Sequence, residues 1–393
     1  MDILSIDFGT SFCASAYLSD NGVPCPISFG LNQYNGVCYK FPTVIQYALD
    51  QFGKEKKIIG EMALSNLNQS NHADSSIISK IKTELRESKG YIVNGRPKQS
   101  VQIVGDLFTR IKELAEQEVN ASFTKVIITH PAQYELNKQT LLIESAKLSG
   151  FTDIILLEEP KAASYAFIEK HNIAVDSGAI VFDYGGGTID VAYLYYNSEK
   201  NLDFKFAPES KPQCGGEYID NVVHNYIQGV LGEGKSRLIS PLLLANCSQM
   251  KINFKASDLE TIVYNNTAIQ FSREKFDKII QEKVDEAITL LKDVKKICDD
   301  KSFPINYIFL NGGSSRLRTV QEKISAIFHD TKILEYGGDD LAVAIGAILY
   351  YKKNVLEDSI GSTRIDTVHV IDNTQRIIEQ YQKAQYGHFN GRS

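Results

Sequence analysis

Two segments of the chain, far apart in sequence, share one pattern of apolar and polar positions. In each, a short apolar run ends at an aspartate, a glycine-bearing turn follows, and a second apolar segment returns. The first covers residues 3–18 and contains Asp7 and Gly9, and the second covers residues 180–194 and contains Asp183 and the glycines at 185–187. Apolar runs separated by turn residues are typical of paired β-strands. The pattern therefore predicts two β-hairpins, each with an aspartate where its first strand ends.

These two segments align without a gap. Asp7 matches Asp183, Gly9 matches Gly185, and the tripeptide Ala-Tyr-Leu at 16–18 matches the same tripeptide at 192–194, with a constant offset of 176 residues. Such an offset is too long for a solenoid repeat, whose period is roughly 20–50 residues. It indicates two duplicated lobes of one chain.

Outside the hairpins, helical and strand patterns alternate. Apolar spacing predicts helices over 107–115 and over 136–148, the second ended by Gly150. Short apolar runs predict strands at 126–128, 154–157 and 307–310. Asp20-Asn21-Gly22 predicts a tight turn after the first hairpin. Strands that alternate with helices indicate an α/β fold whose sheets are covered by helices.

Composition narrows the class of protein. The 393 residues are 43% apolar and 23% charged, with a net charge of −6, which argues against nucleic acid as a partner. The six cysteines are scattered without a C-x-x-C pair, as expected for free thiols in a reducing compartment. Neither a signal peptide nor a membrane-spanning segment is predicted. We therefore expect a cytoplasmic protein without a membrane partner.

The glycine turns suggest the chemistry. Consecutive backbone N–H groups in such a turn form an anion-binding nest. An aspartate beside it would repel phosphate unless a cation such as Mg²⁺ lies between them. The paired hairpins with Asp7 and Asp183 thus predict a clamp on a metal–polyphosphate. The alternative interpretation is a pair of surface hairpins that need glycine only for their turns.

A second phosphate motif points elsewhere. Residues 229–236 read GVLGEGKS and match the phosphate-loop pattern G-x-x-x-x-G-K-[ST], which includes Lys235. That loop requires a buried strand before it, whereas residues 218–227 show helical spacing. We expect Gly229 to be a helix C-cap. Ser240 and Pro241 should begin the next helix as its N-cap and first residue.

Seven motifs occur in an order that resembles the ATPase domain of the DnaK-type, seventy-kilodalton heat-shock chaperones. They are Asp7 to Ser11, His130-Pro131-Ala132, Glu158 to Ala163, Asp183 to Thr188, Gly215-Gly216-Glu217, Gly312 to Arg316, and Ala342 to Ala347. The resemblance runs over about residues 1–352. It implies an actin-like ATPase fold: α/β, with two duplicated ribonuclease H-like lobes around a central nucleotide cleft.

The resemblance also implies a domain plan. Lobe I would cover 1–178, with a shortened small subdomain at about 36–100, and lobe II would cover 179–352, with a small subdomain at about 217–276. Residues 353–393 lie beyond the resemblance and would be a tail, partly helical or disordered, in which the apolar residues of 372–385 predict a short helix.

Roles for individual residues follow from the same resemblance. Asp7 and Asp183 would hold Mg²⁺ through water, and Glu159 would orient the attacking water. Lys82 would face the γ-phosphate, with Lys80 as the alternative. The catalytic residues would be Glu159, Lys82, Asp183 and Thr188. The nucleotide-binding residues would be Gly9, Thr10, Ser11, Gly185, Gly186, Gly187, Thr188, Gly215, Gly216, Lys251, Gly312, Gly313, Ser314, Arg316 and Asp340.

The chain departs from the family pattern in several places. The segment 248–255, which best fits the family's adenine-binding helix, keeps Lys251, but the expected acid, arginine and serine are replaced. We therefore expect either weaker nucleotide affinity or looser base selectivity. The stretch from Lys82 to Pro131 is short, and Gln139 replaces an expected arginine. After Tyr351 nothing resembles the family's linker or peptide-binding domain.

The expected function is slow hydrolysis of Mg-ATP in the cleft, with lobe closure as the output. The ligands would be ATP or ADP, Mg²⁺ and, as a further cation, K⁺. Partners would be co-chaperones or a peptide-binding domain on a longer chain. Three alternatives stay open: an actin-like filament-forming ATPase, a small-molecule kinase, and a pseudo-ATPase that binds nucleotide without hydrolysis.

Overall fold

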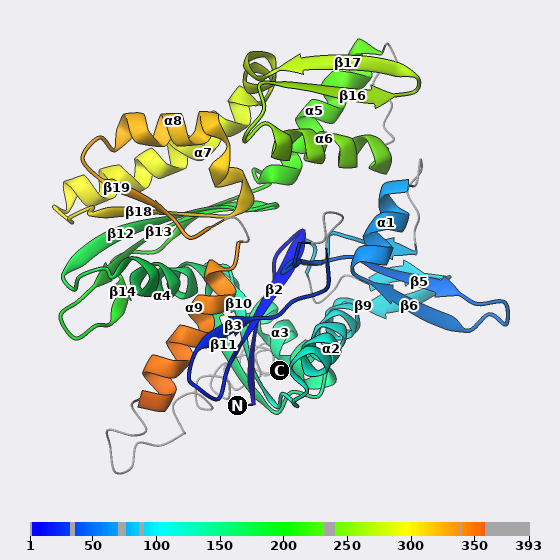
Figure 1. Cartoon of the computed structure of the whole chain (residues 1–393), viewed down its shortest axis with the longest axis horizontal. Coiled ribbons are helices and arrows are strands. Elements are labelled where there is room, and N and C mark those ends of the chain that lie inside the picture. The colour runs from blue at the N-terminus through cyan, green and yellow to red at the C-terminus, as the bar shows by residue number, and fades with distance from the viewer. Residues whose placement is uncertain are drawn as a thin grey trace, which may run out of the picture. The chain divides into compact units, whose positions relative to one another are not determined.

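The computed structural model describes residues 2–31, 36–69, 76–85, 90–231, 240–337 and 340–357. Two compact units are present (Figure 1). The first contains residues 1–60, 78–171 and 337–393, and the second contains 61–77 and 172–336. The first unit is thus discontinuous in sequence: α9 (Ala342–Tyr351), expected in the second lobe, belongs to the first unit.

The first unit is organised around a mixed sheet with the strand order β11-β10-β1-β2-β3, and β4 is paired to β2. Strand β1 is antiparallel to β2 and parallel to β10, which is parallel to β11. Its strands are β1 (Ile3–Asp7), β2 (Phe12–Leu18), β3 (Pro24–Pro26), β4 (Phe41–Pro42), β10 (Lys125–His130) and β11 (Asp153–Glu158). The turn predicted at residues 20–22 joins β2 to β3, and Gly22 donates its N–H to the Ser19 carbonyl at 2.9 Å.

Helices cover both faces of this sheet, as the alternating pattern predicted. Leu4 and Ile6 share a core with apolar residues of α2 (Ser100–Val119) and α3 (Leu136–Leu148). On the opposite face, the Ser5 hydroxyl donates to the Ala344 carbonyl of α9 at 2.8 Å. Helix α9 also packs against α4 (Glu159–His171) so closely that Gly346 has no room for a side chain. This contact explains why the end of the described chain belongs to the first unit.

Two small hairpins complete the first unit. They are β5 (Ile45–Leu49) with β6 (Glu55–Ile59), to which β7 (Ile77–Ile78) adds a strand, and β8 (Gly90–Val93) with β9 (Arg96–Gln99). Tyr47 is fully buried, and its hydroxyl donates to Asp106 of α2 at 2.9 Å. This bond links the first hairpin to the helical layer.

The second unit has a sheet with the same arrangement as the first. Its order is β14-β13-β12-β18-β19, so β12 is again antiparallel to its hairpin partner and parallel to a later strand, β18. The strands are β12 (Ser177–Tyr184), β13 (Thr188–Tyr196), β14 (Leu202–Phe204), β15 (Glu209–Pro212), β18 (Tyr307–Asn311) and β19 (Lys332–Glu335).

The pairing register confirms the duplication residue by residue. Asp7 lies opposite Ala14 in the first hairpin, and Asp183 lies opposite Asp190 in the second. The ungapped sequence alignment matches Asp7 with Asp183 and Ala14 with Asp190, so the two hairpins pair equivalent positions. Both hairpins and the actin-like fold predicted from the sequence are therefore confirmed.

Helices and one further hairpin surround the second sheet. The apolar face of β12 and β13 packs on α7 (Arg273–Asp300) and α8 (Arg318–Ile327) in one core. The remaining elements are α1 (Glu61–Gln69), α5 (Gly216–Val230), α6 (Pro241–Asn253), and a hairpin of β16 (Leu259–Tyr264) and β17 (Thr267–Ser272). No helix in the described parts of the chain is both long and apolar enough to cross a membrane.

The helix-end predictions give mixed results. Helix α3 has the predicted bounds, and Gly150 follows it at φ +77. Ser240 caps α6 by accepting the Leu243 N–H at 3.3 Å, as predicted. The prediction for Gly229 was wrong: α5 continues through Val230 and its C-cap is Leu231. Residues 232–236, which contain Lys235, and the segment 372–385 lie outside the described residues.

Two helical glycines allow a matched test of packing. A Cβ at Gly346 of α9 would lie 1.8 Å from the Ala162 carbonyl oxygen, whereas at Gly229 of α5 nothing lies within 4 Å. We expect Gly346→Ala to lower the free energy of unfolding by about 1–3 kcal/mol through overpacking. Gly229→Ala should raise it by about 0.5–1 kcal/mol, because alanine favours the helix. Urea unfolding of both variants measures the difference, and equal effects would contradict the close α4–α9 contact.

Candidate functional site

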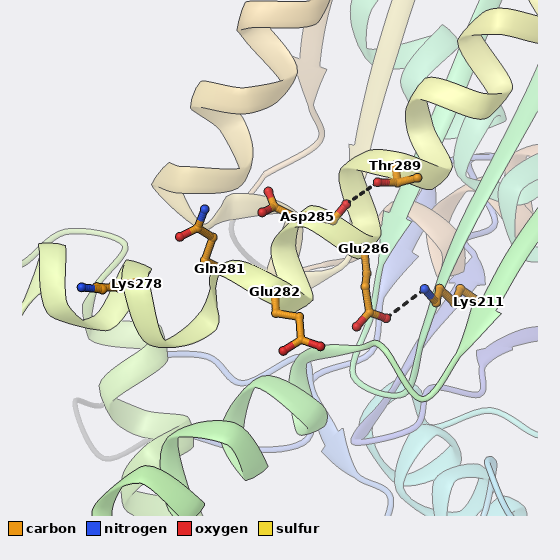
Figure 2. Close-up of a pocket in the computed structure, with 7 residues that line it drawn as sticks. All are labelled: Lys211, Lys278, Gln281, Glu282, Asp285, Glu286 and Thr289. Carbon is orange, nitrogen blue, oxygen red and sulfur yellow. Dashed lines mark hydrogen bonds and ion pairs between the residues drawn. The ribbon is translucent and has the colours of Figure 1, made fainter.

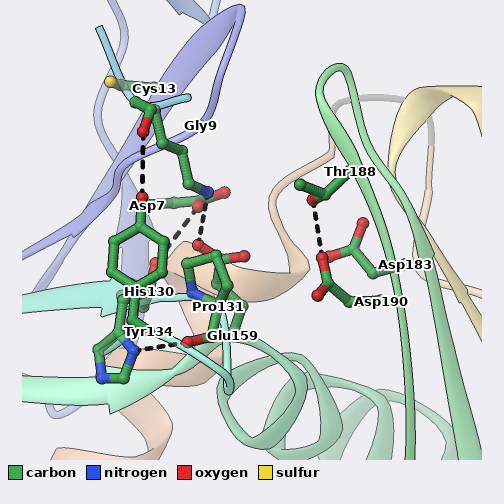
Figure 3. Close-up of polar contacts among 12 residues, drawn as sticks. Asp7, Gly9, Cys13, His130, Pro131, Tyr134, Glu159, Asp183, Thr188 and Asp190 are labelled. Carbon is green, nitrogen blue, oxygen red and sulfur yellow. Dashed lines mark hydrogen bonds and ion pairs between the residues drawn. The ribbon is translucent and has the colours of Figure 1, made fainter. Parts of the chain in front are cut away.

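The first unit gathers polar groups at one edge of its sheet (Figure 3). Asp7 ends β1, Thr129 lies opposite it on the parallel strand β10, and Glu159 begins α4 directly after β11. The Thr129 hydroxyl donates to Asp7 Oδ1 at 3.3 Å. The carboxyl ends of parallel strands are where open α/β sheets bind ligands. The topology therefore brings Asp7 and Glu159 to the same sheet edge from distant parts of the sequence.

Lys82 joins this edge from a turn that precedes α2. Its Nζ lies 2.7 Å from Glu159 Oε1, and the two side chains are only 10% and 9% exposed. Burial by itself lowers the pKa of Lys82, but the charges of Glu159 and Asp7 outweigh it and raise that pKa well above its usual range. Lys82 is therefore charged at any physiological pH. Of the two lysines considered for this role, Lys82 lies beside Glu159, and Lys80 is exposed.

Asp7 is half-buried beside this ion pair. Burial, and after it the charge of Glu159, raise the pKa of Asp7 to about 7, although Lys82 and the Thr129 hydrogen bond partly offset them. A carboxylate in such surroundings is stabilised by an additional cation. The geometry thus leaves Asp7 suited to bind a positive ion.

The turn after Asp7 depends on a close backbone approach. A Cβ at Gly9 would lie 2.0 Å from the Phe12 carbonyl oxygen, so only glycine fits. The Gly9 N–H donates to the Asp7 carbonyl at 3.1 Å, and the Thr43 hydroxyl donates to the Gly9 carbonyl at 3.0 Å. Thr10 is buried and Ser11 is half-buried in the same turn. The predicted phosphate turn of the first hairpin is therefore held in place by backbone and side-chain contacts within the first unit.

The second unit repeats this edge with different partners. Asp183, on β12, accepts a hydrogen bond at 2.7 Å from Asn311 Nδ2 on the parallel strand β18. The Thr188 hydroxyl donates to Asp190 Oδ2 at 2.7 Å, a contact drawn in Figure 3. Gly312 follows Asn311 at φ +75, and a Cβ there would lie 2.7 Å from Asp183 Oδ1. Asn311 thus occupies the position that Thr129 holds in the first unit.

The three glycines of the second turn are held by a neighbouring segment. The N–H groups of Gly215, Gly216 and Glu217 donate to the carbonyls of Gly187, Gly185 and Gly186, at 3.4, 2.8 and 2.8 Å respectively. In a planar trans peptide, the carbonyl and the following N–H point in opposite directions. The N–H groups of residues 186–188 are therefore directed away from this segment. They can form the anion-binding nest that the sequence predicted.

Lys251 is committed to contacts inside the second unit. Its Nζ donates to the Gly216 carbonyl and to Asp220 Oδ2, both at 2.8 Å, and the side chains of Lys251 and Asp220 are 12% and 7% exposed. Burial raises the pKa of Asp220, while Lys251 opposes that shift. A Cβ at Gly216 would lie 2.5 Å from Ser314 Oγ and 2.9 Å from this Nζ. Lys251 and Ser314 thus both lie beside the glycine segment.

Two other predicted residues lie on separate units. Arg316 is half-buried at the end of a short 3₁₀ helix, Gly313–Arg316, in the second unit. Asp340, in the first unit, has a positive φ of 52 and pairs with Lys40 at 2.5 Å between Nζ and Oδ2.

Comparisons with known proteins agree with this fold. The family model described as Hsp70 protein matches residues 43–373. The chain belongs to the Hsp70 family. It is 25% identical to the chaperone protein HscA homolog of Haemophilus influenzae (strain 86-028NP) over 64% of this chain. It is 25% identical to that of Acinetobacter baumannii (strain AYE), and 27% identical to that of Rickettsia prowazekii (strain Madrid E), over 68% of this chain in each case.

The match covers only part of those relatives. It includes 40%, 44% and 42% of the three HscA homologs. The Hsp70 family model begins at residue 43, so the hairpin around Asp7 lies before it. The assignment of that hairpin to the Hsp70 fold rests on its shared topology and register with the second one.

Each unit has a carboxylate at its glycine turn that suits an Mg²⁺ ion held mainly by water. Among the residues that the structure describes, no group of three or more His, Cys, Asp or Glu side chains could enclose a metal ion. Mg²⁺ usually keeps several waters and uses one or two carboxylates together with substrate phosphates. Asp7 and Asp183, each bonded on one oxygen by a strand neighbour, are carboxylates of that kind.

Sequence reasoning missed two polar groups in the second unit. Asp190 closes the glycine motif in the sequence, yet no role was predicted for it. Asn311 directly precedes the predicted Gly312 and Gly313 at the end of a predicted strand. The internal duplication could have indicated Asn311, because it makes the strand that ends at Asn311 equivalent to the strand that carries Thr129.

Proposed function

We propose that this Hsp70-family domain binds Mg-ATP with the phosphate turns of both units and hydrolyses it slowly. The proposal rests on the two hairpins, whose strands pair in the same register. In the first unit, the buried Lys82–Glu159 ion pair lies beside the aspartate of the hairpin. A symmetric pair of turns suits the binding of phosphates. The additional ion pair on one side suits the chemistry at the terminal phosphate.

Each group has a role that its surroundings support. The N–H groups of residues 186–188, and those of the turn Gly9–Thr10–Ser11, would donate to phosphate oxygens. Asp7 and Asp183 would hold Mg²⁺ through water, and Mg²⁺ when bound would neutralise charge on the phosphates. The Lys82 ammonium would stabilise charge on the γ-phosphate oxygens. Glu159 would accept a hydrogen bond from the attacking water, and Thr188 would be kept in place by Asp190.

On the base side, Lys251, Arg316, Gly312, Gly313, Ser314 and Asp340 are proposed to contact the nucleoside. The guanidinium plane of Arg316 suits stacking on a purine. Because Lys251 already binds Asp220 and Gly216, and its helix lacks the family's other clamp residues, we propose that base selectivity is weaker than in other members. K⁺ is proposed as a further cation.

The wider role rests on relatives that are longer than this chain. They are called chaperones, so we propose a chaperone-type ATPase with co-chaperones or a peptide-binding domain as partners, acting in the cytoplasm. Membership of the Hsp70 family disfavours the filament-forming and small-molecule kinase alternatives. A pseudo-ATPase is distinguished by a thermal shift with nucleotide but no release of phosphate.

Calorimetry and thermal unfolding test the binding half of this proposal. Mg-ADP should stabilise the wild-type protein, since a ligand at a hundredfold excess over its Kd adds about 2.7 kcal/mol to the free energy of unfolding. Asp183→Asn should weaken the Mg²⁺-dependent part of this affinity. Lys235→Ala should bind as the wild type does. An unchanged melting temperature at millimolar nucleotide would contradict the proposal, and loss of binding in Lys235→Ala would favour the phosphate-loop interpretation.

A further inference from the structure

Helix α7 contacts the segment that holds the glycine turn of the second unit. Cys214 immediately precedes Gly215, the first of the three residues whose N–H groups hold the turn. Its fully buried thiol donates to Glu286 Oε2 of α7 at 3.3 Å and lies 3.9 Å from the Lys283 carbonyl. The Tyr184 hydroxyl, from the residue just before Gly185, lies 3.5 Å from the same carbonyl. One turn of α7 thus reaches both segments that meet at the glycine turn.

Glu286 is itself fixed by two lysines. Lys211 of β15 and Lys283 of α7 each lie 2.9 Å from one of its carboxylate oxygens. Hydrogen bonds from these lysines lower the pKa of Glu286 to about 2, so it is an ionised acceptor at any working pH. Burial raises the pKa of Cys214 to about 11, so the thiol keeps its proton and remains a donor. Hydrogen bonds to an ionised acceptor are the stronger kind.

The same carboxylate faces an open groove on α7. The groove has a volume of about 600 Å³. Figure 2 shows its lining residues, with Glu286 reaching Lys211 and with Glu282 one turn earlier on the helix. Glu286 is therefore accessible to solvent, and it also contacts Cys214, which precedes the segment that holds the glycine turn. Glu282 lines the same groove and provides a matched control.

We infer that Cys214 and Glu286 act together as positioning residues for the phosphate turn Gly185–Thr188. The contact fixes the segment 214–217, that segment orients the carbonyls of residues 185–187, and the opposite N–H groups are thereby aimed at a phosphate. Neither residue touches the nucleotide in this scheme. The inference deepens the proposed function and rests on it, because it assumes that the turn holds a phosphate group.

The test compares affinities for Mg-ADP and AMP by calorimetry, well below the melting temperature of each variant. Cys214→Ala and Glu286→Ala should each weaken Mg-ADP binding by about tenfold, near the lower end of the effect of losing one hydrogen bond to a charged group. Affinity for AMP should change less, because AMP lacks the β-phosphate that the turn would hold. Glu282→Ala should bind both nucleotides as the wild type does, and Cys214→Ser, which keeps a donor, should retain most of the affinity.

A double-mutant cycle separates positioning from general loss of structure. If the two side chains act through one contact, the double variant Cys214→Ala/Glu286→Ala should bind no more weakly than either single variant. Additive losses, unchanged Mg-ADP affinity in both single variants, or equal losses for AMP and ADP would overturn the inference while the proposed function stands. A wild-type protein that binds no nucleotide would overturn both.

Discussion

Lys82→Ala is expected to lower the free energy of unfolding by about 3–5 kcal/mol, the usual effect of removing one partner of a buried ion pair. Lys82 and Glu159 are about 10% and 9% exposed and 2.7 Å apart, so truncation leaves the Glu159 carboxylate without this counter-charge in a buried site. Asp7 adds to the effect, because Lys82 is a charge that lowers the pKa of Asp7. The variant would have a buried carboxylate, Glu159, and a half-buried one, Asp7, without the lysine that offsets their charge.

Lys80→Ala is the matched control for this prediction. Lys80 lies two residues earlier and is exposed, so its loss should change stability by less than about 0.5 kcal/mol. Urea unfolding without nucleotide gives both values. The double variant Lys82→Met/Glu159→Gln should recover part of the loss, because it removes both charges and keeps similar volumes. Equal stabilities of Lys82→Ala and Lys80→Ala would show that the buried pair does not form.

Local sequence signals predicted the two hairpins and their aspartates well. Glycine turns and apolar strands are short-range patterns, and the internal repeat by itself places Asp7 and Asp183 at equivalent strand ends. The structure adds what pairs with them: Thr129 and Asn311 come from strands more than a hundred residues further along the chain. Such partners depend on strand order, which local patterns do not contain.

Other features depended on long-range packing and could not be read locally. Lys82 lies in a turn whose flanking residues give no periodic signal, so only the resemblance separated it from Lys80. The assignment of α9 to the first unit follows from the contact of Gly346 with Ala162 and from the Ser5–Ala344 hydrogen bond, both between residues far apart in sequence. Gly229 was expected at a helix end because glycine often occurs there, but α5 continues past it and ends at Leu231.

Glu159→Gln is expected to slow ATP hydrolysis by about ten- to a thousandfold, the range for a positioned acid–base group. Glu159 begins α4 at the sheet edge beside Asp7, and in the proposed function its carboxylate orients the attacking water rather than binding phosphate. A group that acts only in the transition state lowers turnover and leaves ground-state binding nearly intact. The Kd for Mg-ATP should therefore change little, because in the proposed function backbone N–H groups of the two turns would supply most of the phosphate contacts.

Single-turnover hydrolysis and calorimetric affinity, measured on the same preparations, separate these two effects. Glutamine keeps the shape of Glu159 but removes the charge that pairs with Lys82, so part of any rate loss could come from a displaced lysine. Lys82→Ala resolves this: it should slow hydrolysis too, and the double variant Lys82→Ala/Glu159→Gln should be no slower than the worse single variant if the pair acts as a unit. If Glu159→Gln hydrolyses ATP at the wild-type rate, water is not oriented by this carboxylate. Nucleotide binding without a catalytic role for Glu159 would then be the better account of the site.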